Sequence, residues 1–134
     1  MENLDRLCAE EGYEFAKKVN EAFNDPKKTE NLLTRSLDVL QDQGIYSFVL
    51  FCRSRGETER DGARKIEEIT KEILKDKLKP NLIGGGDLLK EICDEKGLAS
   101  RFEDLTLAIK VLEKSLIYAR YHSKAMSKSS KQTG

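Results

Sequence analysis

The segment 45-IYSFVLFC-52 is the most apolar stretch of this chain, and it decides the fold class. Its β-branched and aromatic residues suit a strand. However, no second segment has the pattern of a partner strand, and an isolated strand would leave its backbone N–H and C=O groups without hydrogen bonds. We therefore predict a short buried helix that ends at 53-RSRG-56, within an all-α protein.

Two helices are predicted before this segment. The first ends at Asp25-Pro26, because a residue that precedes proline avoids helical geometry. Its apolar residues recur at spacings of three, four and seven, as on one helix face: Leu4, Leu7, Cys8, Phe15, Val19 and Phe23. The second helix runs from about Thr29 to Gln43, where Gly44 is well placed to terminate it.

Three further helices are predicted after the segment. Thr58 can cap the first of them, which ends at Lys79-Pro80. A glycine loop follows, and Asp87 then caps a short helix that ends at Gly97. Their apolar positions are Ile66, Ile69 and Ile73 in the first, and Leu88, Leu89, Ile92 and Cys93 in the second.

The last helix begins with 100-SRFE-103, which has the pattern of a capping box. Its inner face carries Leu105, Ile109, Leu112 and Leu116, and we expect it to fade near Ser123. The remaining residues are rich in serine and lysine and have almost nothing to bury. The predicted architecture is a single compact bundle of five to six helices over residues 1–123, with a disordered basic tail over residues 124–134.

Composition narrows the class of protein further. The 134 residues include 24 basic and 24 acidic side chains, so the formal net charge is zero. No apolar run approaches the roughly 20 residues that cross a bilayer, and the acidic N-terminus does not resemble a signal segment. We therefore expect a cytoplasmic protein with no membrane partner. Cys8, Cys52 and Cys93 form no C-x-x-C pair, and we expect each to be a small buried hydrophobic residue.

The sequence contains no pattern typical of catalysis, so we expect no enzyme activity, metal or cofactor. His122 is the single histidine and has no metal-binding spacing. Gly84-Gly85-Gly86 precedes a helix, as phosphate-binding loops do, but no Lys-Ser or Lys-Thr follows and no strand precedes it. We interpret the three glycines as a flexible linker.

The basic residues are more informative, because charge is distributed unevenly along the chain. Residues 1–25 hold seven acids and three bases, whereas residues 101–134 hold seven bases and three acids. These ends could meet each other, meet a neighbouring copy, or leave the basic end free for a polyanion.

Two helices also carry cationic stripes. At about 100° per residue, Lys110, Lys114, Arg120 and Lys124 fall within about 120° of one another, together with Tyr121, which could stack on a base. Arg60 and Arg64, with Lys71 and Lys75, fall within about 60°. Arg53 and Arg55 form a local cluster after the apolar helix. Such stripes can bind backbone phosphates without reading sequence, although an ordinary solvated surface has the same pattern.

Two segments resemble the small all-helical subunit of the type III-B CRISPR effector, the Cmr complex. One is 40-LQDQGI-45 followed by 48-FVLFCRSR-55, which resembles the family's polar-Gly-apolar turn, buried helix and base-rich end. The other lies within residues 98–119, where 105-LTLAI-109 and 111-VLEKSL-116 are similar to its long final helix. The type III-A small subunit is a similar helical protein and remains an alternative.

The resemblance implies a non-catalytic scaffold for antiviral defence. Such subunits stack in a short filament along the guide RNA–target RNA duplex and contact phosphates and neighbouring subunits, while other subunits cleave. The family's RNA-facing surface maps by segment onto Arg53, Arg55, Lys110 and Lys114. Wheel geometry alone adds Arg60, Arg64, Arg120 and Lys124 to the predicted RNA-binding residues.

A different class of function stays open. A small helical adaptor that binds only protein would have the same fold, and its acidic first helix could pair with the basic last helix of another copy. A histidine phosphotransfer domain that uses His122 is the third interpretation.

Overall fold

A computed structural model describes the backbone of residues 4–133 and the side chains of residues 4–129. Within this range there are six α-helices and no strand, which confirms the predicted all-α bundle. A π-helix, η1, continues α4, and a short 3₁₀ turn, η2, precedes the last helix. The elements are α1 (Leu4–Phe23), α2 (Pro26–Gln43), α3 (Ile45–Arg53), α4 (Arg60–Glu72), η1 (Ile73–Lys77), α5 (Leu88–Cys93), η2 (Leu98–Ser100) and α6 (Phe102–Thr133).

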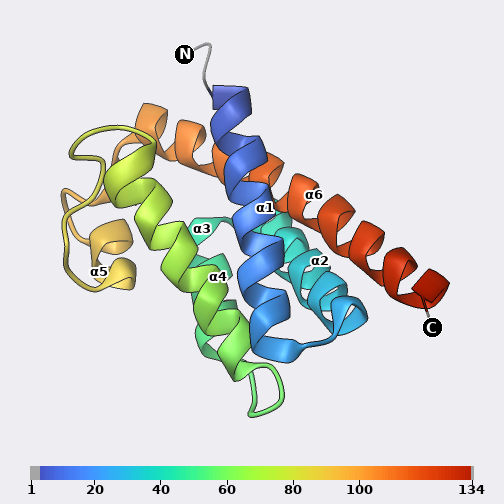
Figure 1. The fold of residues 1–134 in the computed structure, drawn as a ribbon. Coiled ribbons are helices and arrows are strands. Elements are labelled where there is room, and N and C mark those ends of the chain that lie inside the picture. Colours follow the sequence, from blue (N-terminus) through green and yellow to red (C-terminus); the bar gives the residue numbers. More distant parts are fainter. Residues whose placement is uncertain (1–3, 134) are drawn as a thin grey trace.

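The helix α1 is the centre of the bundle. It packs against α6 and α2 on one side and against α4 on the other, so that α1 lies between α4 and α6 (Figure 1). The apolar helix α3 packs against α2, α4 and α5. The largest fully buried side chains come from α1 to α5, from η1 and from the loop before α5: Phe15, Leu32, Leu33, Leu37, Leu40, Phe48, Ile66, Ile73, Leu74, Leu82, Leu88 and Ile92.

Short-range sequence signals set most of the helix boundaries. The Asp25 carboxylate accepts hydrogen bonds from the backbone N–H groups of Lys27 and Lys28, both at 3.1 Å, and Pro26 occupies the first turn of α2. Gly44 separates α2 from α3 at φ 94°, a conformation that favours glycine. Asp87 caps α5 as predicted, because its carboxylate accepts from the backbone N–H of Lys90.

Two predicted caps do not form. The helix α4 begins at Arg60, and the cap position is Glu59 rather than Thr58. The Ser100 hydroxyl donates to the Gly97 carbonyl at 2.7 Å, so it serves the 3₁₀ turn and not a capping box at the start of α6. In both places a tight turn precedes the helix. Before α4 the helix begins one residue later than predicted, and before α6 the turn takes the hydroxyl of Ser100 as its hydrogen-bond donor.

The last helix is longer than the sequence predicted. Helix α6 continues past Ser123 to Thr133, so residues 124–129 are helical where we expected the disordered tail to begin. Met126 packs partly buried against the core, and the Ser123 hydroxyl donates to the Ala119 carbonyl inside the bundle. These contacts give the helix something to pack on beyond the point where the apolar pattern fades. Gly134 lies outside the described residues.

Helices α1 and α6 cross at close range. A Cβ atom on Gly12 would lie 2.6 Å from Cβ of Tyr118 and 2.8 Å from the backbone oxygen of Ser115. Only a residue without a side chain allows the two backbones to approach so closely. This crossing fixes the position of α6, which carries four of the predicted RNA-binding residues.

Candidate nucleic-acid interface

Arg53 holds three elements of the bundle together. Its guanidinium lies 2.7 Å from a Glu67 carboxylate oxygen on α4 and 2.9 Å from a carboxylate oxygen of Asp87, the residue that caps α5. The hydrogen bonds to Glu67 raise the pKa of Arg53 above its usual value, with a further contribution from Asp87. Two carboxylates already pair with this cation, so Arg53 links the end of α3 to α4 and to the start of α5.

Arg55 and Lys114 are also engaged within the chain. The Arg55 guanidinium stacks 3.9 Å from the centre of the Phe51 ring and its Nε donates to the Phe51 carbonyl at 3.0 Å. Lys114 forms an ion pair with Asp5 on α1, and the Tyr118 hydroxyl donates to the same carboxylate at 2.9 Å. The hydrogen bond from Lys114 lowers the pKa of Asp5. The acidic start and the basic end of the chain therefore meet each other here.

Arg60, Arg64 and Lys110 are exposed, and no ion pair or side-chain hydrogen bond engages them within the described residues. Arg60 and Arg64 lie on α4 and Lys110 lies on α6, with α1 between the two helices (Figure 1). The structure therefore separates the two predicted cationic stripes and does not join them into one surface.

Arg120, Lys124 and Tyr121 come together at a cavity between α2 and α6. Ile117 and Glu30 complete its lining, and its volume is about 160 Å³. Tyr121 is 69% exposed. None of these three residues of α6 makes an ion pair or a side-chain hydrogen bond within residues 4–129, and the buried Nε of Arg120 has no hydrogen-bond partner there. A buried guanidinium nitrogen without a partner is costly. Arg120 and Lys124 both line the cavity, and their side chains carry N–H donors that an added acceptor can use.

Glu30 is the residue of this cavity that the sequence did not indicate. Its side chain is 12% exposed, and its one ion pair in the described part of the chain is with Lys27, at 3.6 Å. The helical wheel of α6 cannot reveal a residue of α2, because only the packing of the two helices places Glu30 beside Arg120. Ile117 lies on α6 itself and was missed because the cavity forms only where α2 packs beside it, which a helical wheel does not show.

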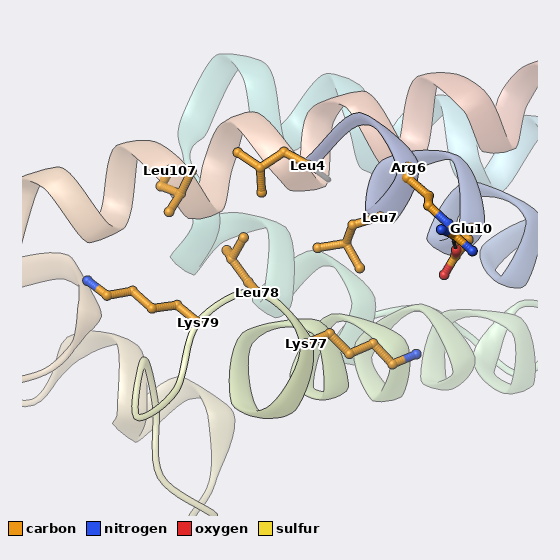
Figure 2. A pocket seen from close by; sticks show the side chains of 8 residues that line it. All are labelled: Leu4, Arg6, Leu7, Glu10, Lys77, Leu78, Lys79 and Leu107. Atoms are coloured by element: carbon orange, nitrogen blue, oxygen red, sulfur yellow. Dashed lines mark hydrogen bonds and ion pairs between the residues drawn. The ribbon is translucent and has the colours of Figure 1, made fainter. Parts of the chain in front are cut away.

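A larger, apolar groove lies elsewhere on the bundle. Leu4 and Leu7 of α1, Leu78 after η1 and Leu107 of α6 point toward the same space, which has a volume of about 460 Å³ (Figure 2). Its charged residues are already paired, since Arg6 binds Glu10 and Lys79 binds Asp104, each at 2.9 Å. Lys77 binds the buried Glu11 at the same distance. This groove offers an apolar surface rather than a phosphate-binding one.

The other sequence candidates also have definite places. The Gly84 amide donates to the Glu91 carboxylate at 2.6 Å, and the Lys71 ammonium donates to the Gly85 carbonyl. These hydrogen bonds fix the glycine loop to α4 and α5, and they leave the Gly84 N–H unavailable to a phosphate. This differs from the flexible linker we expected. The His122 ring lies edge-on to Tyr13, with 5.6 Å between ring centres.

The three cysteines divide by exposure. Cys8 and Cys52 are buried as predicted, but Cys93 is exposed, which corrects the expectation that all three are buried. It is the last residue of the short helix α5, whose inward side carries Leu88 and Ile92 instead. Burial raises the pKa of the Cys52 thiol to about 12.

Comparisons with known proteins identify no relative of this chain: no family model, curated protein or solved structure matches it. No helix within residues 4–133 is both long enough and apolar enough to cross a membrane.

Proposed function

We propose that this chain is a non-catalytic structural subunit of a type III-B CRISPR ribonucleoprotein in the cytoplasm, where it stacks along the guide RNA–target RNA duplex and contacts phosphates. The observation that carries the RNA-contacting role is the cavity between α2 and α6. There two cations and an exposed tyrosine converge without any partner from the described part of the chain. The particular complex rests on the resemblance of residues 40–55 and 98–119 to the family's small subunit.

The proposal changes which cations we expect to contact RNA. Arg53, Arg55 and Lys114 would have to give up partners within the protein before they could bind a phosphate. Arg120 and Lys124 have no partner to give up among residues 4–129, and the same is true of Lys110, Arg60 and Arg64. A phosphate oxygen is a strong acceptor for both guanidinium and ammonium groups. The contact surface therefore centres on the C-terminal half of α6.

Binding of a short double-stranded RNA tests the proposal. At low salt, where screening is weakest, we expect measurable binding by fluorescence anisotropy, with a log–log salt slope that reflects the phosphates neutralised. The double variant Arg120→Glu and Lys124→Glu should weaken binding and reduce the slope by about 1.5–2. The matched control is Lys90→Glu with Lys96→Glu, two exposed lysines that lie on α5 and just after it. No affinity for RNA at any salt, or equal binding by both double variants, would contradict the proposal.

A protein-only adaptor is the second candidate, and one observation favours it. Tyr46 and Leu50 lie one turn apart on α3 and are 41% and 43% exposed, so they present apolar surface to a partner. An adaptor of this kind would show no RNA binding, and its interaction with a partner would depend on Leu50 rather than on Arg120. The salt titration above distinguishes the two functions.

A further inference from the structure

The cavity between α2 and α6 combines groups that a simple ion cannot satisfy together. Arg120 and Lys124 attract an anion, but Glu30 repels one from the same space. A simple cation meets the opposite problem, since two positive groups face one carboxylate. The lining therefore fits a ligand that carries both an anionic group and N–H donors, in separate places.

The ring of Tyr121 and the small volume of the cavity restrict the chemical class of ligand further. Tyr121 is 69% exposed and makes no ring contact or hydrogen bond in the described part of the chain, so its ring is available for stacking. A volume of about 160 Å³ is below the usual range for a whole drug-sized ligand, which is about 300–1,000 Å³. One aromatic ring system fits such a space, while a charged group attached to it remains at the rim.

We propose that this cavity binds a single unpaired RNA nucleotide, with its base stacked on Tyr121, its phosphate held by Arg120 and Lys124, and its base edge bound by Glu30. This inference rests on the proposed function, because RNA contact is what makes a nucleotide the natural ligand. An ionised carboxylate only accepts hydrogen bonds, so Glu30 selects bases that present donors. Unpaired bases are typically recognised in this way, by stacking on aromatic rings and by hydrogen bonds to the Watson–Crick edge.

Guanine is the base that matches Glu30 best. Its N1–H and its N2 amino group lie side by side and can donate to both oxygens of one carboxylate, which is a charge-assisted bidentate interaction. Uracil presents one N–H between two carbonyl oxygens, and those oxygens are repelled by the carboxylate. A guanine in a duplex cannot bind in this way, because its Watson–Crick edge is already paired. The cavity therefore selects an unpaired guanine nucleotide over an unpaired uridine.

Titration of the whole chain with GMP and UMP tests the inference. With ¹⁵N-labelled protein we expect GMP to shift the amide signals of Ile117, Arg120, Tyr121 and Lys124 in a saturable manner, with about tenfold higher affinity than UMP. Tyr121→Ala should weaken GMP binding by about tenfold, whereas Tyr46→Ala, which removes another exposed tyrosine, should leave it unchanged. Glu30→Gln should remove the preference for GMP over UMP and retain binding of both. Thermal melting of each variant confirms that it is folded.

The outcomes separate this inference from the proposed function. Equal affinities for GMP and UMP, or unchanged GMP binding by Tyr121→Ala, would overturn the nucleotide site. Duplex RNA has no unpaired base, so its binding depends on the cations and not on Tyr121 or Glu30. Duplex binding that depends on these cations, in a protein that ignores GMP, leaves the proposed function standing and refutes the nucleotide site. GMP binding without any RNA binding refutes the proposed function and supports the cavity as a nucleotide site.

Discussion

Replacement of Gly12 by alanine should destabilise the bundle, although alanine is the better helix former. Gly12 lies in α1 where it crosses α6, and it is buried. An added methyl group would lie 2.6 Å from Cβ of Tyr118, 2.8 Å from the carbonyl oxygen of Ser115 and 3.3 Å from the backbone nitrogen of Ala119. These three atoms belong to the backbone of α6 or are attached directly to it. No change of side-chain rotamer can move them, so the helices themselves must separate.

The size of the effect follows from these distances. Carbon atoms in ordinary contact are about 3.5–4.0 Å apart, so α1 and α6 must separate by roughly 1 Å. Overpacking of this kind costs about 1–3 kcal/mol, and the upper part of that range applies because the whole interface moves. The helix propensity of alanine over glycine offsets about 1 kcal/mol. We expect a net loss of about 2 kcal/mol, which lowers the Tm of a chain of this size by roughly 6–10 °C.

Urea unfolding followed by circular dichroism measures the loss directly. The matched control is Gly56→Ala, because a Cβ atom on Gly56 would have no neighbour within 4 Å among the described residues and its φ is not in the left-handed region. That variant should stay within about 0.5 kcal/mol of the unmodified chain. A Gly12→Ala variant as stable as the Gly56→Ala variant would show that α1 and α6 are not in close contact at this point.

Three further predictions concern thiols, acid and an ion-pair cross-link. Iodoacetamide should alkylate the exposed Cys93 in the folded chain and spare Cys52, which is buried and whose pKa is raised to about 12. Mass spectrometry of the labelled peptides measures the two extents of alkylation. Equal labelling of the two cysteines would contradict the burial of Cys52. The hydrogen bond from Arg53 lowers the folded-state pKa of Asp87, so its stabilising contribution is present above the ordinary value of 3.8 and is lost as the pH falls below it. The urea concentration at the midpoint of unfolding should therefore decrease when the pH falls below about 4. This decrease should be smaller in the Asp87→Asn variant. Arg53→Met should lower the free energy of unfolding by about 1 kcal/mol, given the partial exposure of the ion pair with Glu67, and an unchanged urea midpoint would refute the cross-link.

The fold was predictable to the extent that short-range chemistry determines it. The apolar segment 45-IYSFVLFC-52 forms a helix because no other strand exists within the described residues to satisfy its backbone, and that reasoning needs the sequence alone. The cap made by Asp87 was also predicted from adjacent residues. The cap made by Asp25 was not, and it starts α2 at Pro26 rather than at about Thr29. Ser100 was predicted wrongly, because its hydroxyl donates to the Gly97 carbonyl in the preceding turn and the capping-box pattern does not include that turn.

The candidate site was predictable in its exposed cations but not in their partners. A helical wheel places a charged side chain on an outward face, and it contains no information about residues far away in the sequence. Asp87 is 34 positions from Arg53, and Asp5 approaches Lys114 only because α1 and α6 cross. Whether a surface cation is available to a ligand therefore depends on tertiary contacts, which the sequence pattern leaves open.

This distinction reorders the predicted RNA-binding residues. The positions taken from the resemblance lie near the end of α3 and at the middle of α6, and of these Arg53, Arg55 and Lys114 are engaged inside the chain while Lys110 is not. The positions taken from helix geometry have no such partners in the described residues, and two of them, Arg120 and Lys124, share a cavity with an exposed tyrosine. A cation that already has a partner within the chain must give up that ion pair when it binds a phosphate, at a cost of up to about 1 kcal/mol for pairs as exposed as these. We therefore expect the C-terminal half of α6 to contribute more to RNA binding than Arg53 and Arg55, even though the resemblance maps onto those two arginines and not onto Arg120 or Lys124.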